Sequence, residues 1–155
     1  MENSKRYVVI CSTGRTAVYY GCTEDGTSCE WQHTFFKRPT PDAVYALLEA
    51  LINKRTDERI LNGFVWNGKG VYLSTENQFN FKAAYDLAVQ TGGATLPIKF
   101  KLGEQDGMPV YHVFEDMESF SDFYQQAIAF IVKTLNDGWE EKDSVKEWIV
   151  EQLKQ

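Results

Sequence analysis

The chain has 155 residues, of which 43% are apolar and 14% aromatic. This length suits one domain with a core that needs no disulfide or metal, and the apolar content excludes a disordered chain. No apolar run approaches the roughly 20 residues of a membrane span, and the N-terminal residues MENSKRYVVIC lack the pattern of a signal peptide. We therefore expect a globular protein that folds in the cytoplasm of a cell and binds no membrane.

The formal net charge is −6, and the whole acidic excess lies near the C-terminal end. Residues 1–114 carry 12 Lys and Arg against 12 Asp and Glu, whereas residues 115–155 carry 4 against 10. Nonspecific nucleic-acid binding needs clustered cations, so the pattern argues against it. The acidic end is either a solvated helix face or a surface for a basic partner.

The cysteines Cys11, Cys22 and Cys29 show no CxxC spacing, and the chain has only two histidines to join them. This pattern predicts no zinc site, and nothing in it indicates a cofactor. We expect three reduced cysteines on or near strands, because free cysteine usually packs as a small apolar side chain.

The first part of the chain is expected to be an antiparallel meander followed by a helix. Its three extended runs are separated by turn residues, and Thr40 with Pro41 then marks a helix start. The expected strands are Tyr7–Cys11, Thr16–Cys22 and Trp31–Phe36. The polar segment Asn53–Glu58 is read as a connector, which predicts an N-terminal portion 1–58 and a second portion 59–155, or one continuous domain.

The second part is expected to alternate hairpins and helices. Asn67-Gly68 is a strong hairpin turn after the strand 60–66, because both residues tolerate positive φ. Thr75 and Gln78 form a capping-box pattern before a helix at 76–91. A second hairpin turns at 103–107, a helix follows at 117–135 with a stop at 136–138, and a short amphipathic helix ends the chain at 145–153. The fold class is therefore α+β, with antiparallel hairpins packed against about four helices.

Several strings between residues 63 and 145 resemble a domain family of bacteriophages and prophages. They are VWNGKGVYLSTENQFNFKAAYDLA, TGGATLPIKFKLG and FYQQAIAFIVKTLNDGW. The family is found in or beside tail-fibre and other virion-associated proteins, notably in phages of gut anaerobes. The resemblance implies a phage lineage and carries no catalytic residue over to this chain.

No pattern predicts a catalytic centre. The run Cys11–Arg15 is too short for a phosphate-binding loop with a nucleophilic cysteine, and residues 67–70 match no nucleotide fingerprint. His33 and His112 lie in strand-like runs without a recognisable triad. The acidic residues at 115–118 are typical of a first helical turn, where they interact with free amides and the helix dipole.

The aromatic residues are the more suggestive feature, with 8 Tyr, 10 Phe and 4 Trp. Aromatic side chains ringed by charge are common in protein interfaces. The candidate interaction surface consists of Trp139, Trp148, Ile149 and Leu153. The alternative is that the last helix uses these residues to dock on the core.

The expected function is a non-catalytic phage or prophage protein that acts by protein–protein contact or self-association, as a virion-associated, tail-associated or assembly accessory component. The alternative is a phage-encoded counter-defence protein that binds a host protein or a nucleotide ligand. Arg15, Lys37 and Arg38 are the N-terminal candidates for contacts with an anion.

Overall fold

The computed structural model describes residues 5–154, which divide into two compact units. Unit 1 consists of Met1–Glu49 and Asp143–Gln155, and unit 2 of Ala50–Lys142. This division falls inside a helix and groups the C-terminal residues with the N-terminal ones.

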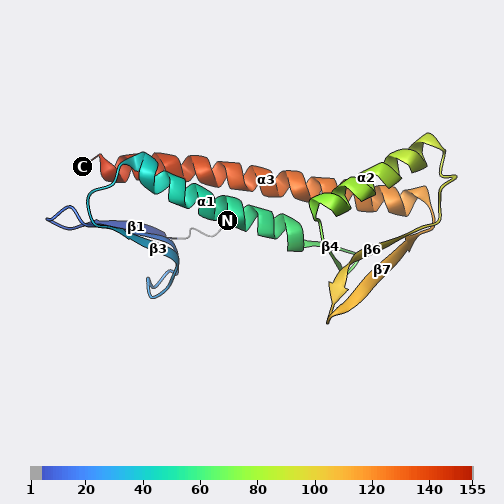
Figure 1. The fold of residues 1–155 in the computed structure, drawn as a ribbon, viewed down its shortest axis with the longest axis horizontal. Coiled ribbons are helices and arrows are strands. Elements are labelled where there is room, and N and C mark those ends of the chain that lie inside the picture. Colours follow the sequence, from blue (N-terminus) through green and yellow to red (C-terminus); the bar gives the residue numbers. More distant parts are fainter. Residues whose placement is uncertain (1–4, 155) are drawn as a thin grey trace. The chain divides into compact units, whose positions relative to one another are not determined.

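The chain alternates antiparallel strands and helices, which confirms the α+β class (Figure 1). Within the described residues the strands form three sheets, with the orders β1-β2-β3, β4-β5 and β6-β7, and the pairings in them are antiparallel. The elements are β1 (Lys5–Ile10), β2 (Thr16–Cys22), β3 (Cys29–Phe35), α1 (Pro41–Asn62), β4 (Phe64–Trp66), β5 (Lys69–Val71), α2 (Thr75–Gln90), β6 (Ile98–Gln105), β7 (Met108–Phe114) and α3 (Met117–Leu153).

Residues 5–154 contain three helices and not four, because the expected helices at 117–135 and 145–153 are one continuous helix, α3. The predicted stop at 136–138 was wrong. Asp137 pairs with Lys133 one turn earlier, with 2.7 Å between Oδ2 and Nζ, and so supports the helix. Gly138 is buried, and a Cβ added there would lie 2.7 Å from Oγ1 of Thr56 on α1. This glycine therefore permits close helix packing.

The predicted connector at 53–58 was also wrong, since these residues continue α1. Their polar side chains have partners on α3: Arg55 pairs with Glu141, and Lys142 Nζ donates to Asn53 Oδ1 at 2.8 Å. A run of polar and charged residues in a sequence does not distinguish a helix paired with a neighbouring helix from a solvated linker. The helix extends through Asn62, so the strand expected from residue 60 begins at Phe64.

Unit 1 contains the predicted meander, with β2 at its centre. One face of β2 is buried, and it carries Thr16, Val18, Tyr20 and Cys22. The helical residues buried in this unit are Val44, Leu48, Val145, Ile149 and Leu153. The alternation along β2 therefore has the period of two expected for a strand with one buried face.

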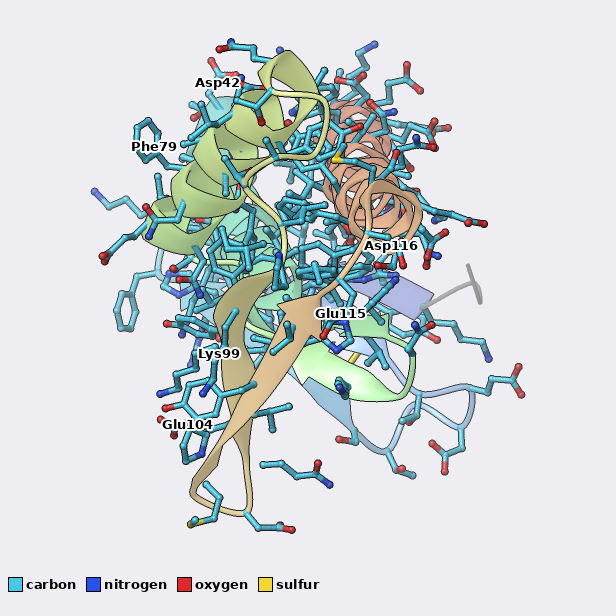
Figure 2. The ribbon with its side chains drawn as sticks, turned by 90° about the vertical axis from the view of Figure 1, so that its right-hand side faces the viewer. Asp42, Phe79, Lys99, Glu104, Glu115 and Asp116 are labelled. Atoms are coloured by element: carbon cyan, nitrogen blue, oxygen red, sulfur yellow. A yellow bond between two sulfur atoms is a disulfide. The ribbon has the colours of Figure 1, made fainter. Side chains whose placement is uncertain are left out.

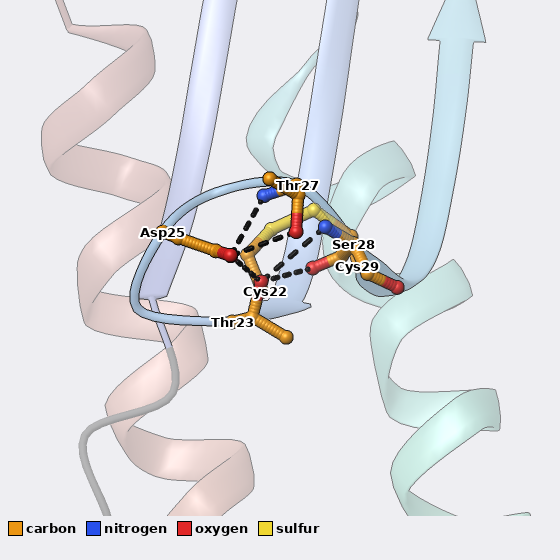
Figure 3. Close-up of a disulfide and its surroundings, with 6 residues drawn as sticks. All are labelled: Cys22, Thr23, Asp25, Thr27, Ser28 and Cys29. Carbon is orange, nitrogen blue, oxygen red and sulfur yellow. Dashed lines mark hydrogen bonds between the residues drawn. A yellow bond between two sulfur atoms is a disulfide. The ribbon is translucent and has the colours of Figure 1, made fainter.

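Cys22 and Cys29 form a disulfide, so the prediction of three reduced cysteines was wrong for two of them (Figure 3). The two residues are direct cross-strand neighbours on β2 and β3, with Cα atoms 3.8 Å apart. Between them, the Asp25 carboxylate accepts hydrogen bonds from Thr23 Oγ1 at 2.6 Å, Thr27 Oγ1 at 2.8 Å and Thr27 N at 3.1 Å. The Thr23 hydroxyl bond, followed by the two bonds from Thr27, lowers the pKa of Asp25 to about 2.

Unit 2 is organised by two hairpins. Asn67 and Gly68 have φ values of 48° and 75°, which confirms the predicted turn between β4 and β5. The second hairpin joins β6 to β7, and Tyr72 N, just after β5, donates to Leu102 O on β6 at 2.7 Å. This bond ties the end of the first hairpin to the second.

Helix α2 begins one residue earlier than the capping-box pattern predicts. Ser74 is the N-cap, and its Oγ accepts a bond from Asn77 N at 3.1 Å. The Gln78 side chain donates to the Leu73 carbonyl at 2.8 Å instead of completing a box with Thr75. The signal thus identified the helix and misplaced its cap.

The core of unit 2 is strongly aromatic. Phe123 of α3 lies at its centre, with ring centroids 5.0–6.2 Å from those of four neighbours. These neighbours are Phe64, Trp66, Phe81 and Phe114. Much of the aromatic content that the sequence associates with an interface therefore lies in this core.

Candidate functional site

The four apolar residues predicted as an interaction surface lie in different environments. Ile149 and Leu153 are buried in unit 1, which agrees with the docking alternative for the last helix. Trp148 is half-buried, with the Arg6 guanidinium carbon 4.9 Å from the centroid of its ring. Trp139 belongs to unit 2 and is 54% exposed. Of the four, Trp139 presents the largest surface to a partner.

The three predicted anion contacts are all exposed in unit 1. The Arg38 guanidinium donates to the Leu153 carbonyl at 2.7 Å, which satisfies a free acceptor at the C-terminal end of α3. The Arg15 carbonyl accepts a bond from Cys11 N at 2.9 Å, so Arg15 lies in a hairpin turn. Arg38 therefore stabilises the end of α3. The cavity of unit 2 is not lined by Arg15, Lys37 or Arg38.

A cavity of about 630 Å³ lies in unit 2, beside β5, β6 and the N-terminal end of α2. Its charged lining residues are Glu76, Lys101 and Glu104. Lys101 Nζ lies 2.8 Å from Glu104 Oε1, so the cation is already paired. The converging Arg and Lys side chains that a nucleotide phosphate requires are not part of this lining.

His112 takes part in a packed cluster in unit 2. Its Nδ1 lies 3.0 Å from Lys69 Nζ, and its ring lies edge-on to Trp66 with centroids 4.9 Å apart. Burial, and then the positive charge of Lys69, lower the pKa of His112, so the neutral ring accepts the lysine bond. Trp66 Nε1 in turn donates to Asp122 Oδ2 at 3.0 Å. The cluster joins the two hairpins to α3.

The acidic residues before α3 have the helix-end role that the sequence predicts. Asp116 Oδ1 accepts a bond from Ser119 N at 2.8 Å, which is the geometry of an N-cap. His33 is exposed on β3, between Trp31 and Phe35 in ring contact. Neither feature brings a nucleophile and a base together.

The strongest surface feature of unit 2 is a sector of α3 without charge. At about 100° per residue, the positions from 121 to 139 that share this sector are all uncharged. We call it the neutral face, and it consists of Ser121, Tyr124, Gln125, Ile128, Ala129, Val132, Leu135, Asn136 and Trp139. The three charged residues between 121 and 139 lie outside it, and they are Asp122, Lys133 and Asp137.

Three large apolar side chains stand exposed on the neutral face. Ile128 is 43% exposed, Val132 50% and Trp139 54%. Leu135 between them is half-buried. Single exposed apolar residues are normal on protein surfaces, whereas these three share one helical sector.

A smaller apolar row lies on α2. Phe79 is 69% exposed, and Ala83 and Leu87 follow at intervals of four residues. Figure 2 shows Phe79 pointing away from α2 on the side opposite to α3. This row is therefore separate from the neutral face.

Sequence reasoning identified Trp139 but not Ile128 or Val132. The buried row of α3 runs through Phe120, Phe123 and Ala127, and the exposed row has the same helical period about 120° away. Apolar spacing alone does not distinguish the two rows. The signal that was available is the absence of charge from one sector of an otherwise acidic helix.

Comparisons of the chain with protein families, with curated proteins and with solved structures give no match. No helix within residues 5–154 combines the length and the apolar character of a membrane span. Over the same residues, His, Cys, Asp and Glu side chains form no group of three or more that could hold a metal ion.

Proposed function

We propose that this chain is a non-catalytic phage or prophage protein that acts by protein–protein contact, as a virion-associated, tail-associated or assembly accessory component. The neutral face of α3 carries this proposal. The phage setting comes from the resemblance of residues 63–145, and the neutral face lies wholly within that range.

Exposing the apolar side chains of this face to water costs free energy. Burying apolar surface stabilises a complex by about 25 cal/mol per Å². A partner that covers the exposed side chains of Ile128, Val132 and Trp139 would therefore gain this binding free energy. An interface centre is typically rich in aromatic residues and poor in charge, with charged residues around it. The neutral face has this composition, in a chain of net charge −6.

Site-specific photocrosslinking tests the proposal. A photoreactive phenylalanine is placed at Val132 and, as a matched control, at Val65, which is 59% exposed on β4 of the same unit. The chain is expressed in the cells that naturally make it, during particle production, and crosslinked products are identified by mass spectrometry. We expect a discrete protein adduct from position 132 and none from position 65. Equal background from both positions would refute contact through this face.

The identity of the adduct separates the two classes of function. A virion or tail protein, recovered also in purified particles, supports the assembly role, whereas a host protein supports the counter-defence alternative. The nucleotide branch of that alternative has weaker support, because the cavity of unit 2 pairs Lys101 with Glu104.

A further inference from the structure

We infer that the cavity beside β5, β6 and the N-terminal end of α2 binds a neutral carbohydrate. The inference goes beyond the proposed function, because the lining of this cavity shares no residue with the neutral face. At about 630 Å³ the cavity falls within the range of about 300–1,000 Å³ that small-molecule sites occupy. Its floor, its aromatic side chain and its polar groups together define the chemical class of the ligand.

Two glycines leave the floor of the cavity as bare backbone. Gly103 on β6 is required by the approach of β5, since a Cβ added there would lie 3.0 Å from the Gly70 carbonyl oxygen. Gly70 on β5 is not required in this way, because a Cβ added there would meet no heavy atom of residues 5–154 within 4 Å. The missing side chain at Gly70 therefore leaves open space in which a flat ring can approach the sheet closely.

Tyr72 supplies an apolar wall beside this open space. Side chains alternate along an extended chain, so Tyr72 and Gly70 face the same side, whereas Val71 between them is buried. Tyr72 N donates to Leu102 O at 2.7 Å, and the Tyr72 carbonyl accepts from Asn77 Nδ2 at 2.7 Å, so its backbone is fixed from two sides. The residue is 44% exposed. A sugar ring presents C–H groups on its faces, and these pack well against an aromatic side chain.

The polar side chains of the lining suit hydroxyl groups. Asn62, at the end of α1, and Asn77, in the first turn of α2, carry amides, which can both donate and accept hydrogen bonds. Glu76 carries a carboxylate, which accepts them. A sugar hydroxyl donates one hydrogen bond and accepts others, so it can pair with either kind of group. Asn62 and Glu76 are both exposed, and their polar atoms are therefore accessible to a ligand.

The charges of the lining favour a neutral ligand over an anion or a cation. Two acids, Glu76 and Glu104, stand against one base, Lys101, whose Nζ is already paired with Glu104 Oε1 at 2.8 Å. An anion would therefore be repelled by the excess carboxylate. The remaining acid, Glu76, is exposed in the first turn of α2, where the helix dipole offsets its charge and water screens it, so it holds a cation weakly. A neutral ligand rich in hydroxyl groups meets neither penalty.

The test is a titration of the isotope-labelled whole chain with sugars, followed by NMR. The neutral probes are glucose, galactose, mannose and N-acetylglucosamine, and the charged analogues are the corresponding uronic acids and amino sugars. We expect at least one neutral sugar to shift the backbone amide signals of Gly70 and Gly103 and the side-chain amide signals of Asn62 saturably, with a dissociation constant of about 1 mM. The corresponding uronic acid should bind about fivefold more weakly, because Glu76 repels it.

Matched variants locate the binding site. Gly70→Phe fills the cavity and should weaken the neutral sugar at least tenfold, whereas Val113→Phe, at an exposed position of β7 outside the lining, should leave the affinity unchanged. Tyr72→Ala should weaken binding to a similar extent, and Tyr111→Ala, which removes an equally exposed ring from β7, is its control. Glu76→Gln should retain the neutral sugar and reduce the discrimination against the uronic acid. Circular dichroism of every variant verifies that it is folded.

Each other outcome overturns the inference in a distinct way. The absence of saturable shifts with every neutral sugar refutes a carbohydrate ligand. Tighter binding of a uronic acid or an amino sugar than of its neutral counterpart refutes the neutral class. Sugar binding that survives both Gly70→Phe and Tyr72→Ala refutes the cavity as its site. None of these results changes the crosslink expected from position 132, so the failure of this inference is distinguishable from the failure of the proposed function.

Discussion

Substitution of Gly138 by alanine tests whether α3 is continuous and closely packed against α1. In an ordinary helix interior, Gly→Ala stabilises by about 1 kcal/mol. Here the new Cβ would lie 2.7 Å from Thr56 Oγ1, and overpacking of this kind costs about 1–3 kcal/mol. We expect Gly138→Ala to change the free energy of unfolding by between about 0 and −2 kcal/mol. On a Thr56→Ala background, the same substitution should stabilise by about 1 kcal/mol.

The assay is urea unfolding of the four proteins of this double-mutant cycle, followed by circular dichroism. The expected coupling between the two sites is about 1–3 kcal/mol, because they are in direct contact. Additive effects would refute the close approach of α1 and α3. If the chain stopped its helix at 136–138, Gly138 would need the positive φ of a helix end, and alanine would destabilise on both backgrounds.

Three further predictions concern the cores and the titrating groups. Phe123→Ala should lower the free energy of unfolding by about 3–5 kcal/mol in urea titrations, because it leaves a cavity among four aromatic rings. The pKa of His112 in the folded chain is below its usual 6.5, so the unfolded chain binds this proton more readily as pH falls. The free energy of unfolding should therefore fall as pH drops below about 6.5. His112→Phe should reduce this dependence in thermal melts at several pH values. Asp25 has a pKa of about 2, so its stabilising hydrogen bonds are fully present above about pH 4 and are lost as pH falls through 2. Asp25→Asn should reduce the fall in melting temperature over this acidic range.

The sequence predicts local structure well wherever one residue type has one conformational use. Asn67-Gly68 gives a turn with positive φ at both positions, and the strands of the meander follow from β-branched and aromatic runs. Prediction from the sequence fails where the same residue type is compatible with two different local structures. Gly138 serves as readily for close packing as for a helix end, and the polar run at 53–58 serves as readily for helix pairing as for a linker.

The sequence is equally ambiguous about which apolar residues of the candidate site are exposed. Trp148 and Ile149 have the helical period and the charged neighbours of an exposed interface, yet unit 1 covers Ile149 completely. Whether an apolar row is buried depends on which other elements pack against it, and that information is long-range. The disulfide is another long-range result, because it depends on the register that places Cys22 opposite Cys29.

The aromatic surplus of the sequence is therefore not itself the sign of an interface. Phe123 and its four ring neighbours account for much of it, and their number reflects how unit 2 builds a core from short hairpins and helices. The informative residues are those that remain exposed after this core is formed, and among them Ile128, Val132 and Trp139 share one uncharged sector. That sector lies on the helix whose sequence carries part of the phage resemblance. The proposed phage setting and the proposed contact surface thus concern the same segment of α3.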